Sequence, residues 1–552
     1  MSSSQSFEKL TQLAFDAMAQ KDWGKAIVLY RSLLAAHPGD EFAFNNYGFS
    51  LWQVGRIGEA IPQFRRALQF NPKCELALSN LVQCLELSHR RSETIPFRRR
   101  LLTLDESSRD HRLQLAKALL DSGRISEALR HYQILLERFA NDAEIVSDYL
   151  LTLNYSDAWN EDEVASEHMR WGRNTVCQQA VSPAVNEVRD RKLRLGYLSA
   201  DFVQHPVGKL LEQILAEHDH EIFDVFLYHD QSYSDEWTNR IRQYGQFREV
   251  HTLSGRELRQ MLLADQLDIL IETGGYTGGR HRFDVLTPRV APTQIAFLGY
   301  PTTTGQPCID FRITDPLTDP PSPAETYYSE KLIRLPTLAI AHRFPEEWCL
   351  ATPSPAKENG YITFGSFNNP AKLSMSALRA WGRMLGRVPN SRLVLKYGDR
   401  LEQASIQERI LETLCESGAL SDRVDFLQAA PTHKEHHLAI ASVDIALDSF
   451  PYQGTFTTLE TLAMGVPVVT LAGKAHCRRA SSAMLLHLSF PDLVTESVDD
   501  YVELCISLAS DVHRLAAMRK ELFNRFHNSR IADPANLTRC LERALLSTLG
   551  QP

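Results

Sequence analysis

The stretch DSFPYQGTFTTLETLAMGVPVVTLAG, residues 448–473, indicates how the C-terminal part of this chain folds. A β-rich run ends shortly before Gly454, which permits a tight turn, and a helical pattern begins near Thr455. The β-branched run VPVVTLA (466–472) that follows predicts a buried strand. A strand, a helix and a second strand in this order are typical of a parallel sheet in an α/β fold.

The start of this helix has the chemistry of an anion site. Thr455, Thr457 and Thr458 offer hydroxyl groups beside the free N–H groups of a helix N-terminus, a combination that suits a pyrophosphate. Glu460, one turn further on, could bond ribose hydroxyls. An ordinary helix capped by threonine in an α/β fold accounts for the same pattern without any ligand.

Short β-rich runs alternate with helical segments from Arg191 onward, and the alternation resumes after a connection rich in proline. This pattern predicts two Rossmann-like halves, each a parallel sheet covered by helices, that face a cleft. Ligands of such sheets bind at the carboxyl ends of the strands. The expected strands are LRLGYLS (193–199), FDVFLYH (223–229), LDILIET (267–273), TQIAFLG (293–299), YITFGSF (361–367), SRLVLKY (391–397), RVDFLQA (423–429), DIALDSF (444–450) and VPVVTLA (466–472).

A second polar loop follows an expected strand in the same half. In TFGSFNNPAKLS (363–374), Asn368, Asn369 and Lys372 come after the strand. A lysine in this place can stand against a diphosphate and stabilise the charge that develops when a nucleoside diphosphate leaves. A single lysine is more often a solvated surface group, so the inference rests on its place in the loop.

The N-terminal third is repetitive. VGRIGEAI (54–61) and SGRISEAL (122–129) lie 68 residues apart, which is two periods of 34, and Pro38 and Pro72 are separated by one period. This is the period of tetratricopeptide repeats, pairs of antiparallel helices that stack into a solenoid with a concave surface. Such a surface could recognise an extended peptide, serve as a scaffold or dimerisation face, or do both.

Composition narrows the class of protein. With 552 residues, 43% hydrophobic and 23% charged, the chain is that of a globular protein with roughly three to four domains. A net charge of −9 argues against a surface that coats nucleic acid. We see no signal peptide and no apolar run long enough for a membrane helix, and the nine cysteines are scattered without a CxxC pair. We therefore expect a cytoplasmic protein with no nucleic-acid or membrane partner.

Taken together, these motifs resemble the nucleocytoplasmic protein O-linked N-acetylglucosamine transferases, which join tetratricopeptide repeats to a catalytic region of two Rossmann-like domains (GT-B). The resemblance implies repeats over 1–142, a helical linker over 143–190, an N-terminal catalytic half over 191–345 and a nucleotide-sugar-binding half over 346–552. Besides the two loops above, the runs that carry it are GYLSADFVQHPVG (196–208), LGYPTTTG (298–305), IDFRITDPLTDPP (309–321) and YYSEKLIRLP (327–336).

The resemblance also implies a site and a reaction. A Ser or Thr hydroxyl of a protein captured by the repeats would displace the nucleotide with inversion, without a metal or other cofactor. The donor would be a UDP-sugar, most simply UDP-N-acetylglucosamine. The implied catalytic residues are His205, as base or positioning residue, Lys372 and, more weakly, Asp265. The implied donor-binding residues are Asn368, Asn369, His436, Gly454, Thr455, Thr457, Thr458 and Glu460, and Gly299, Tyr300 and Pro301 would form the acceptor-side wall.

The donor loop departs from the family pattern. Where the N-acetylglucosamine enzymes carry Gly-His-Thr-Thr and then Asp, this chain has Gly454-Thr455-Phe456-Thr457-Thr458 and Glu460. That loop is similar to those of the SPINDLY-type protein O-fucosyltransferases, which use GDP-fucose. Bacterial relatives similar to N-glucosyltransferases and flagellin glycosyltransferases keep flagellin or another bacterial protein open as the acceptor. A non-catalytic repeat adaptor and a transferase acting on a small molecule are the remaining alternatives.

Overall fold

The structure, a computed structural model, describes residues 3–173, 191–279, 281–322, 324–348 and 353–549. The described chain forms two compact units. One unit comprises Met1–Leu135 with Glu402–Gln407, and the other comprises Leu136–Leu401 with Glu408–Pro552. No helix in the described ranges is both long and apolar enough to cross a lipid bilayer.

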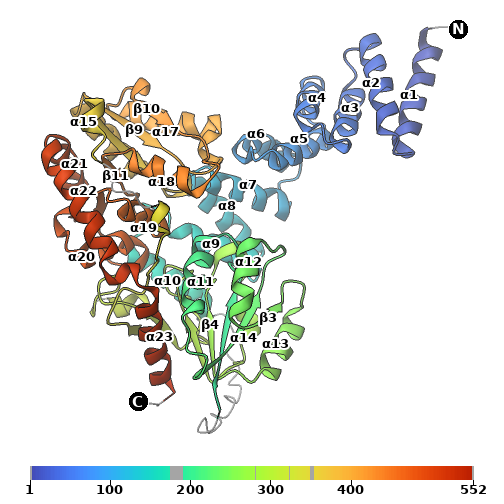
Figure 1. Cartoon of the computed structure of the whole chain (residues 1–552). Helices are drawn as coiled ribbons and strands as arrows, with labels where there is room; N and C mark the ends of the chain where they lie inside the picture. Colours follow the sequence, from blue (N-terminus) through green and yellow to red (C-terminus); the bar gives the residue numbers. More distant parts are fainter. Residues whose placement is uncertain (1–2, 174–190, 280, 323, 349–352, 550–552) are drawn as a thin grey trace. The chain divides into compact units, whose positions relative to one another are not determined.

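The first unit is built of antiparallel helix pairs, as the 34-residue period predicts (Figure 1). Gly48 lies against the ring of Phe64, where a Cβ atom would come within 2.9 Å of a ring carbon. Gly55 and Gly123 both adopt positive φ, 78° and 72°, in the turn between the helices of their repeats. The helices are α1 (Ser3–Ala19), α2 (Trp23–Ala36), α3 (Glu41–Gln53), α4 (Ile57–Phe70), α5 (Glu75–Leu87), α6 (Ile95–Leu104), α7 (Arg109–Asp121) and α8 (Ile125–Arg138).

The second unit contains two parallel sheets, which confirms the expected GT-B architecture. The first sheet has seven strands in the order β3-β2-β1-β4-β5-β6-β7. The order reverses between β1 and β4, so this is the switch point at which a ligand can enter. The strands are β1 (Leu193–Ser199), β2 (Phe223–His229), β3 (Gln246–Glu249), β4 (Ile269–Glu272), β5 (Thr293–Ala296), β6 (Phe311–Thr314) and β7 (Lys331–Arg334).

The second sheet has six strands in the order β10-β9-β8-β11-β12-β13. Its switch point lies between β8 and β11, the strands that precede the two polar loops singled out in the sequence. The strands are β8 (Ile362–Ser366), β9 (Ser391–Leu395), β10 (Val424–Phe426), β11 (Ile445–Leu447), β12 (Val468–Leu471) and β13 (Val494–Thr495).

Helices cover the faces of both sheets because the central strands are apolar on both sides. Around the first sheet the chain forms α11 (Pro206–Ala216), α12 (Glu236–Ile241), α13 (Gly255–Ala264) and α14 (Phe283–Leu286). Around the second it forms α15 (Ala356–Asn359), α16 (Met375–Arg387), α17 (Ala404–Glu416), α18 (His433–Ala441), α19 (Phe456–Ala463), α20 (Ala480–His487), α21 (Val498–Ala509) and α22 (Val512–His527).

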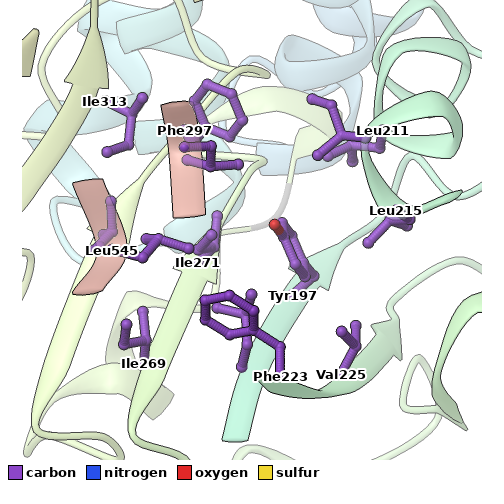
Figure 2. Close-up of a cluster of buried hydrophobic side chains, with 14 of the residues drawn as sticks. Tyr197, Leu211, Leu215, Phe223, Val225, Ile269, Ile271, Phe297, Ile313 and Leu545 are labelled. Atoms are coloured by element: carbon purple, nitrogen blue, oxygen red, sulfur yellow. The ribbon is translucent and has the colours of Figure 1, made fainter. Parts of the chain in front are cut away.

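The last helix, α23 (Pro534–Thr548), returns to the first sheet rather than staying with the second. Figure 2 shows Leu545 of α23 among Ile269 and Ile271 of β4 and Phe297, in one buried apolar cluster. The backbone N–H of Asp219 also donates to Glu542 Oε1 at 2.8 Å. The expected N-terminal half therefore takes part of its core from the far end of the chain, outside the range 191–345.

The expected linker is also part of the second unit. Its described helices are α9 (Ala143–Leu153) and α10 (Glu161–Arg173). Asn154, directly after α9, and His168, within α10, are completely buried. Gly172 lies so close to the loop after β5 that a Cβ atom would come 1.7 Å from the carbonyl oxygen of Gly305. These helices are therefore a packed part of the second unit, whereas residues 174–190 of the expected linker lie outside the described residues.

Candidate active site

The two polar loops of the second sheet meet at its switch point, as the sequence led us to expect. Lys372, after β8, donates a hydrogen bond from Nζ to the carbonyl oxygen of Gln453, after β11, at 2.8 Å. Thr457 Oγ1 donates to Asn368 Oδ1 at 3.0 Å. A lysine, an amide side chain and the start of α19 therefore share one place at the carboxyl edge of the sheet, where an anion can meet all three.

The loop before α19 is fixed tightly. The N–H of Gly454 donates to Asp448 Oδ1 at 2.8 Å, and a Cβ atom at this glycine would lie 2.5 Å from Thr458 Oγ1. Thr455 occupies the N-cap position without a capping bond from its side chain. The hydroxyl of Thr458 is buried and bonded to Ser481 Oγ at 2.8 Å, so Thr458 can offer a ligand only its backbone.

Lys372 is largely surrounded by protein, and its charge is subject to two opposing effects. Burial lowers the pKa of Lys372 to about 8, although the nearby carboxyl group of Asp448 favours the charged amine. Burial in turn raises the pKa of Asp448. The ammonium group also lies 4.0 Å from the centroid of the Tyr452 ring, a cation–π contact. A cationic donor with few water contacts is suited to stabilise a departing diphosphate.

Glu460 lies one turn into α19 and is 5% exposed. His436 Nε2 stands 3.5 Å from Glu460 Oε2, and His436 Nδ1 stands 2.9 Å from Lys396 Nζ. Burial acts to raise the pKa of Glu460, but the bond and charge of His436 and the charge of Lys209 outweigh it, so this pKa is lowered. The carboxylate is thus kept ionised and can accept hydrogen bonds from a ribose or a base.

Lys209 comes from the opposite half of the unit. On α11, its Nζ lies 5.1 Å from the ring centroid of Phe456 and 5.6 Å from that of Trp237. The sequence analysis did not identify Lys209 or Lys396 as site residues. Lys209 lies in an amphipathic helix and Lys396 in an expected strand, and both segments have the residue pattern of ordinary structural elements. The signal that could have found Lys209 is its position one turn after His205.

One of the expected donor residues also has a structural role. Asn369 Oδ1 caps the short helical turn of Pro370–Lys372 by accepting from the N–H of Ala371 at 3.0 Å, and it also accepts from Arg400 Nη1 at 3.3 Å. Its side-chain oxygen is therefore occupied within the protein. Its expected contact with the donor, for which the side-chain nitrogen could serve, stays a prediction.

His205 lies after β1, at the switch point of the first sheet, and caps α11. Its side chain is 46% exposed, and the preceding residue, Gln204, places Nε2 3.4 Å from His433 Nε2 of the other half. A cavity at the facing edges is lined by both halves, with Leu298 and Arg312 on one side and Thr455 on the other. This cavity is lined by neither His205 nor Lys372, but Gln204 and Lys209, on either side of His205, both approach the half that carries the donor loop.

The residues expected to form the acceptor-side wall are largely internal. Gly299 packs on the end of β4, since a Cβ atom there would lie 1.9 Å from the carbonyl oxygen of Thr273. Tyr300 is 2% exposed, and its hydroxyl lies 2.7 Å from His168 Nε2 of α10. Pro301 is buried as well. These residues support the wall from behind rather than presenting side chains to an acceptor.

Asp265 does not lie with His205, and its assignment as a second catalytic candidate has to be corrected. It precedes β4 and therefore sits at the amino end of the sheet, opposite the edge that carries His205. Its carboxylate is bound by Arg248 at 2.6 and 2.7 Å and by the hydroxyl of Tyr228 at 2.7 Å. These bonds tie β2, β3 and α13 together.

Two other carboxyl groups lie at the carboxyl edge instead. Asp201 follows β1, with Oδ1 3.3 Å from His205 Nδ1. Glu272 ends β4, and burial raises the pKa of its side chain to about 7, with the charge of Asp201 adding to the rise. Asp201 belongs to one of the runs that carry the family resemblance, but no role was expected of it. The signal that could have found Asp201 is its position four residues before His205, the candidate base.

Two parallel sheets in one unit, with a cavity lined by both halves and with cationic and helix-terminal donors at the switch point of the second sheet, are typical of the GT-B class of glycosyltransferases. The sequence profile of glycosyl transferase family 41 matches residues 174–344 and 338–541, and a tetratricopeptide repeat profile matches residues 113–159. The chain belongs to glycosyl transferase family 41, which confirms the family resemblance.

Individual relatives agree with this assignment. The chain is 36% identical over 400 residues to the tomato protein named probable UDP-N-acetylglucosamine–peptide N-acetylglucosaminyltransferase SPINDLY, and 38% identical over 402 residues to its rice counterpart. The matches cover 71% and 72% of this chain but 43% of each relative. A solved structure of a Thermobaculum terrenum O-GlcNAc transferase variant matches with a TM-score of 0.80 and 26% identity, over 92% of this chain and 97% of that one.

Proposed function

We propose that this protein transfers a sugar from a nucleoside diphosphate to a Ser or Thr hydroxyl of a protein acceptor, with inversion at the anomeric carbon. The observation that carries the proposal is the meeting of Lys372 with the loop before α19 at one switch point, together with the approach of Gln204 and Lys209, on either side of His205, to the same half. Lys372 and the N–H groups at the start of α19 would take up the charge of the leaving diphosphate. Alignment of the two substrates would supply much of the rate.

UDP-N-acetylglucosamine is the first donor to test, because the names of the relatives specify it. GDP-fucose is the second, because the donor loop has Thr455, Phe456 and Glu460 where the N-acetylglucosamine enzymes carry other residues. Glu460 and His436 lie together where they could contact the ribose or base. We further propose that transfer needs no divalent metal, since Lys372 and helix N–H groups can neutralise the diphosphate, and that the reaction takes place in the cytoplasm.

The test is a thermal-shift titration with UDP and GDP, followed by nucleotide release from UDP-N-acetylglucosamine and GDP-fucose with and without EDTA. A nucleotide that binds only the folded protein raises the melting temperature, and more so the tighter it binds. We expect one nucleotide to stabilise the protein and the matching sugar donor to be turned over at an EDTA-independent rate. Failure of both nucleotides to bind would favour a repeat protein that acts as an adaptor.

The repeats of the first unit would capture the acceptor. Exposed apolar side chains are available on this unit, among them Phe42 at 60% and Leu76 at 64% exposure. A chain lacking these repeats is expected to hydrolyse its sugar donor at the same slow rate as we expect of the full chain, while losing transfer to its protein acceptor. Retention of protein transfer by that chain would remove the repeats from the mechanism.

A further inference from the structure

The side chain of His205 has two partners on the same nitrogen, and they require different protonation states. The N–H of Val207 points at His205 Nδ1 from 3.3 Å, a contact that needs an unprotonated Nδ1. Asp201 Oδ1 lies at the same distance, 3.3 Å, and as a carboxylate it needs a proton on Nδ1. Neutral imidazole carries one proton, so the partner that holds Nδ1 also decides whether Nε2 can accept a proton.

Asp201 is held in place by the loop after β1. Its own N–H donates to Ser199 Oγ at 3.0 Å, and its carbonyl oxygen packs on Gly208 of α11, where a Cβ atom would come within 2.3 Å. The side chain of Asp201 is 16% exposed, against 46% for His205. The carboxyl group is therefore the more enclosed member of the pair, and the imidazole is the more accessible one.

A second carboxyl group stands beside the first. Glu272 ends β4, the neighbour of β1, and accepts hydrogen bonds from the N–H groups of Gly274 at 2.7 Å and Gly275 at 2.8 Å. Burial raises the pKa of both carboxyl groups; the charge of His205 opposes this rise at Asp201, and the two backbone N–H groups and the charge of Arg312 oppose it at Glu272. Two carboxylates this close disfavour each other's ionisation, so a proton on Glu272 helps Asp201 to remain charged.

We propose that Asp201 is the positioning residue that keeps the proton of neutral His205 on Nδ1 and leaves Nε2 free for the acceptor hydroxyl, with Glu272 tuning the charge on Asp201. In the transfer step the hydroxyl oxygen forms a bond to the anomeric carbon as its proton moves to Nε2. The bond from that carbon to the diphosphate oxygen breaks, and its electron pair leaves with the nucleoside diphosphate. This step rests on the proposed function, but the assignment of the proton to Nδ1 does not.

The direct test is nitrogen NMR of the full chain labelled with ¹⁵N-histidine, with the His205 signals identified by their loss in His205→Gln. We expect the Nδ1–H form in the wild type and the Nε2–H form in Asp201→Asn, because the Val207 N–H and the new amide would both donate to Nδ1. Asp224→Asn, the same change on β2 of the same sheet, should leave the His205 signals unchanged. An Nε2–H form in the wild type would overturn the proposal, as would an unchanged tautomer in Asp201→Asn.

Kinetics provide the second arm. With UDP-N-acetylglucosamine or GDP-fucose as the probe, Asp201→Asn should lower kcat about 10²- to 10⁴-fold and leave the donor KM unchanged. Glu272→Gln removes the competing charge, so the acid limb of the kcat profile should move to lower pH. Wild-type kcat in Asp201→Asn would overturn the positioning role. A wild type that shows the Nδ1–H form but turns over neither donor would instead count against the proposed function and leave the tautomer assignment standing.

Discussion

Lys372 Nζ donates to the backbone carbonyl of Gln453 at 2.8 Å, although the two residues are 81 positions apart in the chain. The bond joins the loops after β8 and β11, the two strands that flank the switch point of the second sheet. Lys372 could donate the same hydrogen bond to a diphosphate in place of this carbonyl oxygen. The lysine is therefore already held at the place where the proposed reaction would need it.

Lys372→Ala should abolish transfer while leaving the fold intact. Removal of one cationic donor from a site of charge development is expected to cost about 10²- to 10³-fold in kcat. The measurement is nucleotide release from the donor, with circular dichroism and the melting temperature as checks on folding. Lys357→Ala, which removes an exposed lysine from α15, should retain wild-type turnover. Wild-type activity in Lys372→Ala would refute the role given to this residue.

Affinity for UDP or GDP should fall as the pH rises above about 8. The pKa of Lys372 in the ligand-free protein is about 8, below the ordinary lysine value, so the amine loses its charge over this range while the diphosphate keeps its own. Between that pH and the ordinary lysine pKa, the unfolded chain binds more protons than the folded one. The lysine therefore makes the free energy of unfolding of the ligand-free protein rise with pH. Calorimetric titrations at pH 7 and pH 9.5 measure the change in affinity, and Lys372→Met should flatten it.

Glu460→Gln should weaken nucleotide binding about tenfold, because it removes a buried charge that His436 and Lys209 favour. The effect should appear in the nucleotide Kd and the donor KM more than in kcat, since Glu460 is placed to contact the nucleoside rather than the reacting carbon. Glu416→Gln, at an exposed position of α17, is the matched control. An unchanged Kd for both UDP and GDP in Glu460→Gln would remove this residue from the donor site.

Tyr300→Phe should destabilise the fold by about 1–3 kcal/mol, because it leaves the buried Nε2 of His168 without its partner at 2.7 Å. The measurement is urea unfolding of the second unit within the full chain. Tyr233→Phe removes the same hydroxyl from a side chain that is 56% exposed and should change stability by less than about 0.5 kcal/mol. Equal effects of the two variants would show that the bond to His168 contributes nothing.

Most strands could be predicted because their signal is local. The runs at 193–199 and 223–229 coincide with β1 and β2, whose residues are nearly all buried. Four strands, β3, β6, β7 and β13, were not among those expected from the sequence. The residues of β3 and β7, QFRE and KLIR, are half-exposed at the edges of the first sheet, so neither run carries the apolar signature of a central strand. The short run of β6, FRIT, is interrupted by the buried Arg312, and β13 has two residues.

The meeting of the two polar loops of the second sheet could be predicted because each loop comes directly after a strand. Prediction of the site residues of the first sheet depended on knowing which end of a strand each residue occupies. Asp265 precedes β4, so the rule that ligands gather at carboxyl ends already argues against it. Asp201 and Glu272 obey that rule, but their proximity depends on β1 pairing with β4 across the switch point, a pairing between segments about 70 residues apart. No local pattern encodes that pairing.

The burial of α9 and α10 decides where this chain can be shortened. A truncation at Arg191, where the alternation of strands and helices begins, would strip the partner from the hydroxyl of Tyr300. It would also uncover Gly305, over which Gly172 lies so closely that no side chain fits between them. A shortened chain that is meant to retain a stable second unit therefore has to start upstream of Ala143, so that this helical hairpin remains attached.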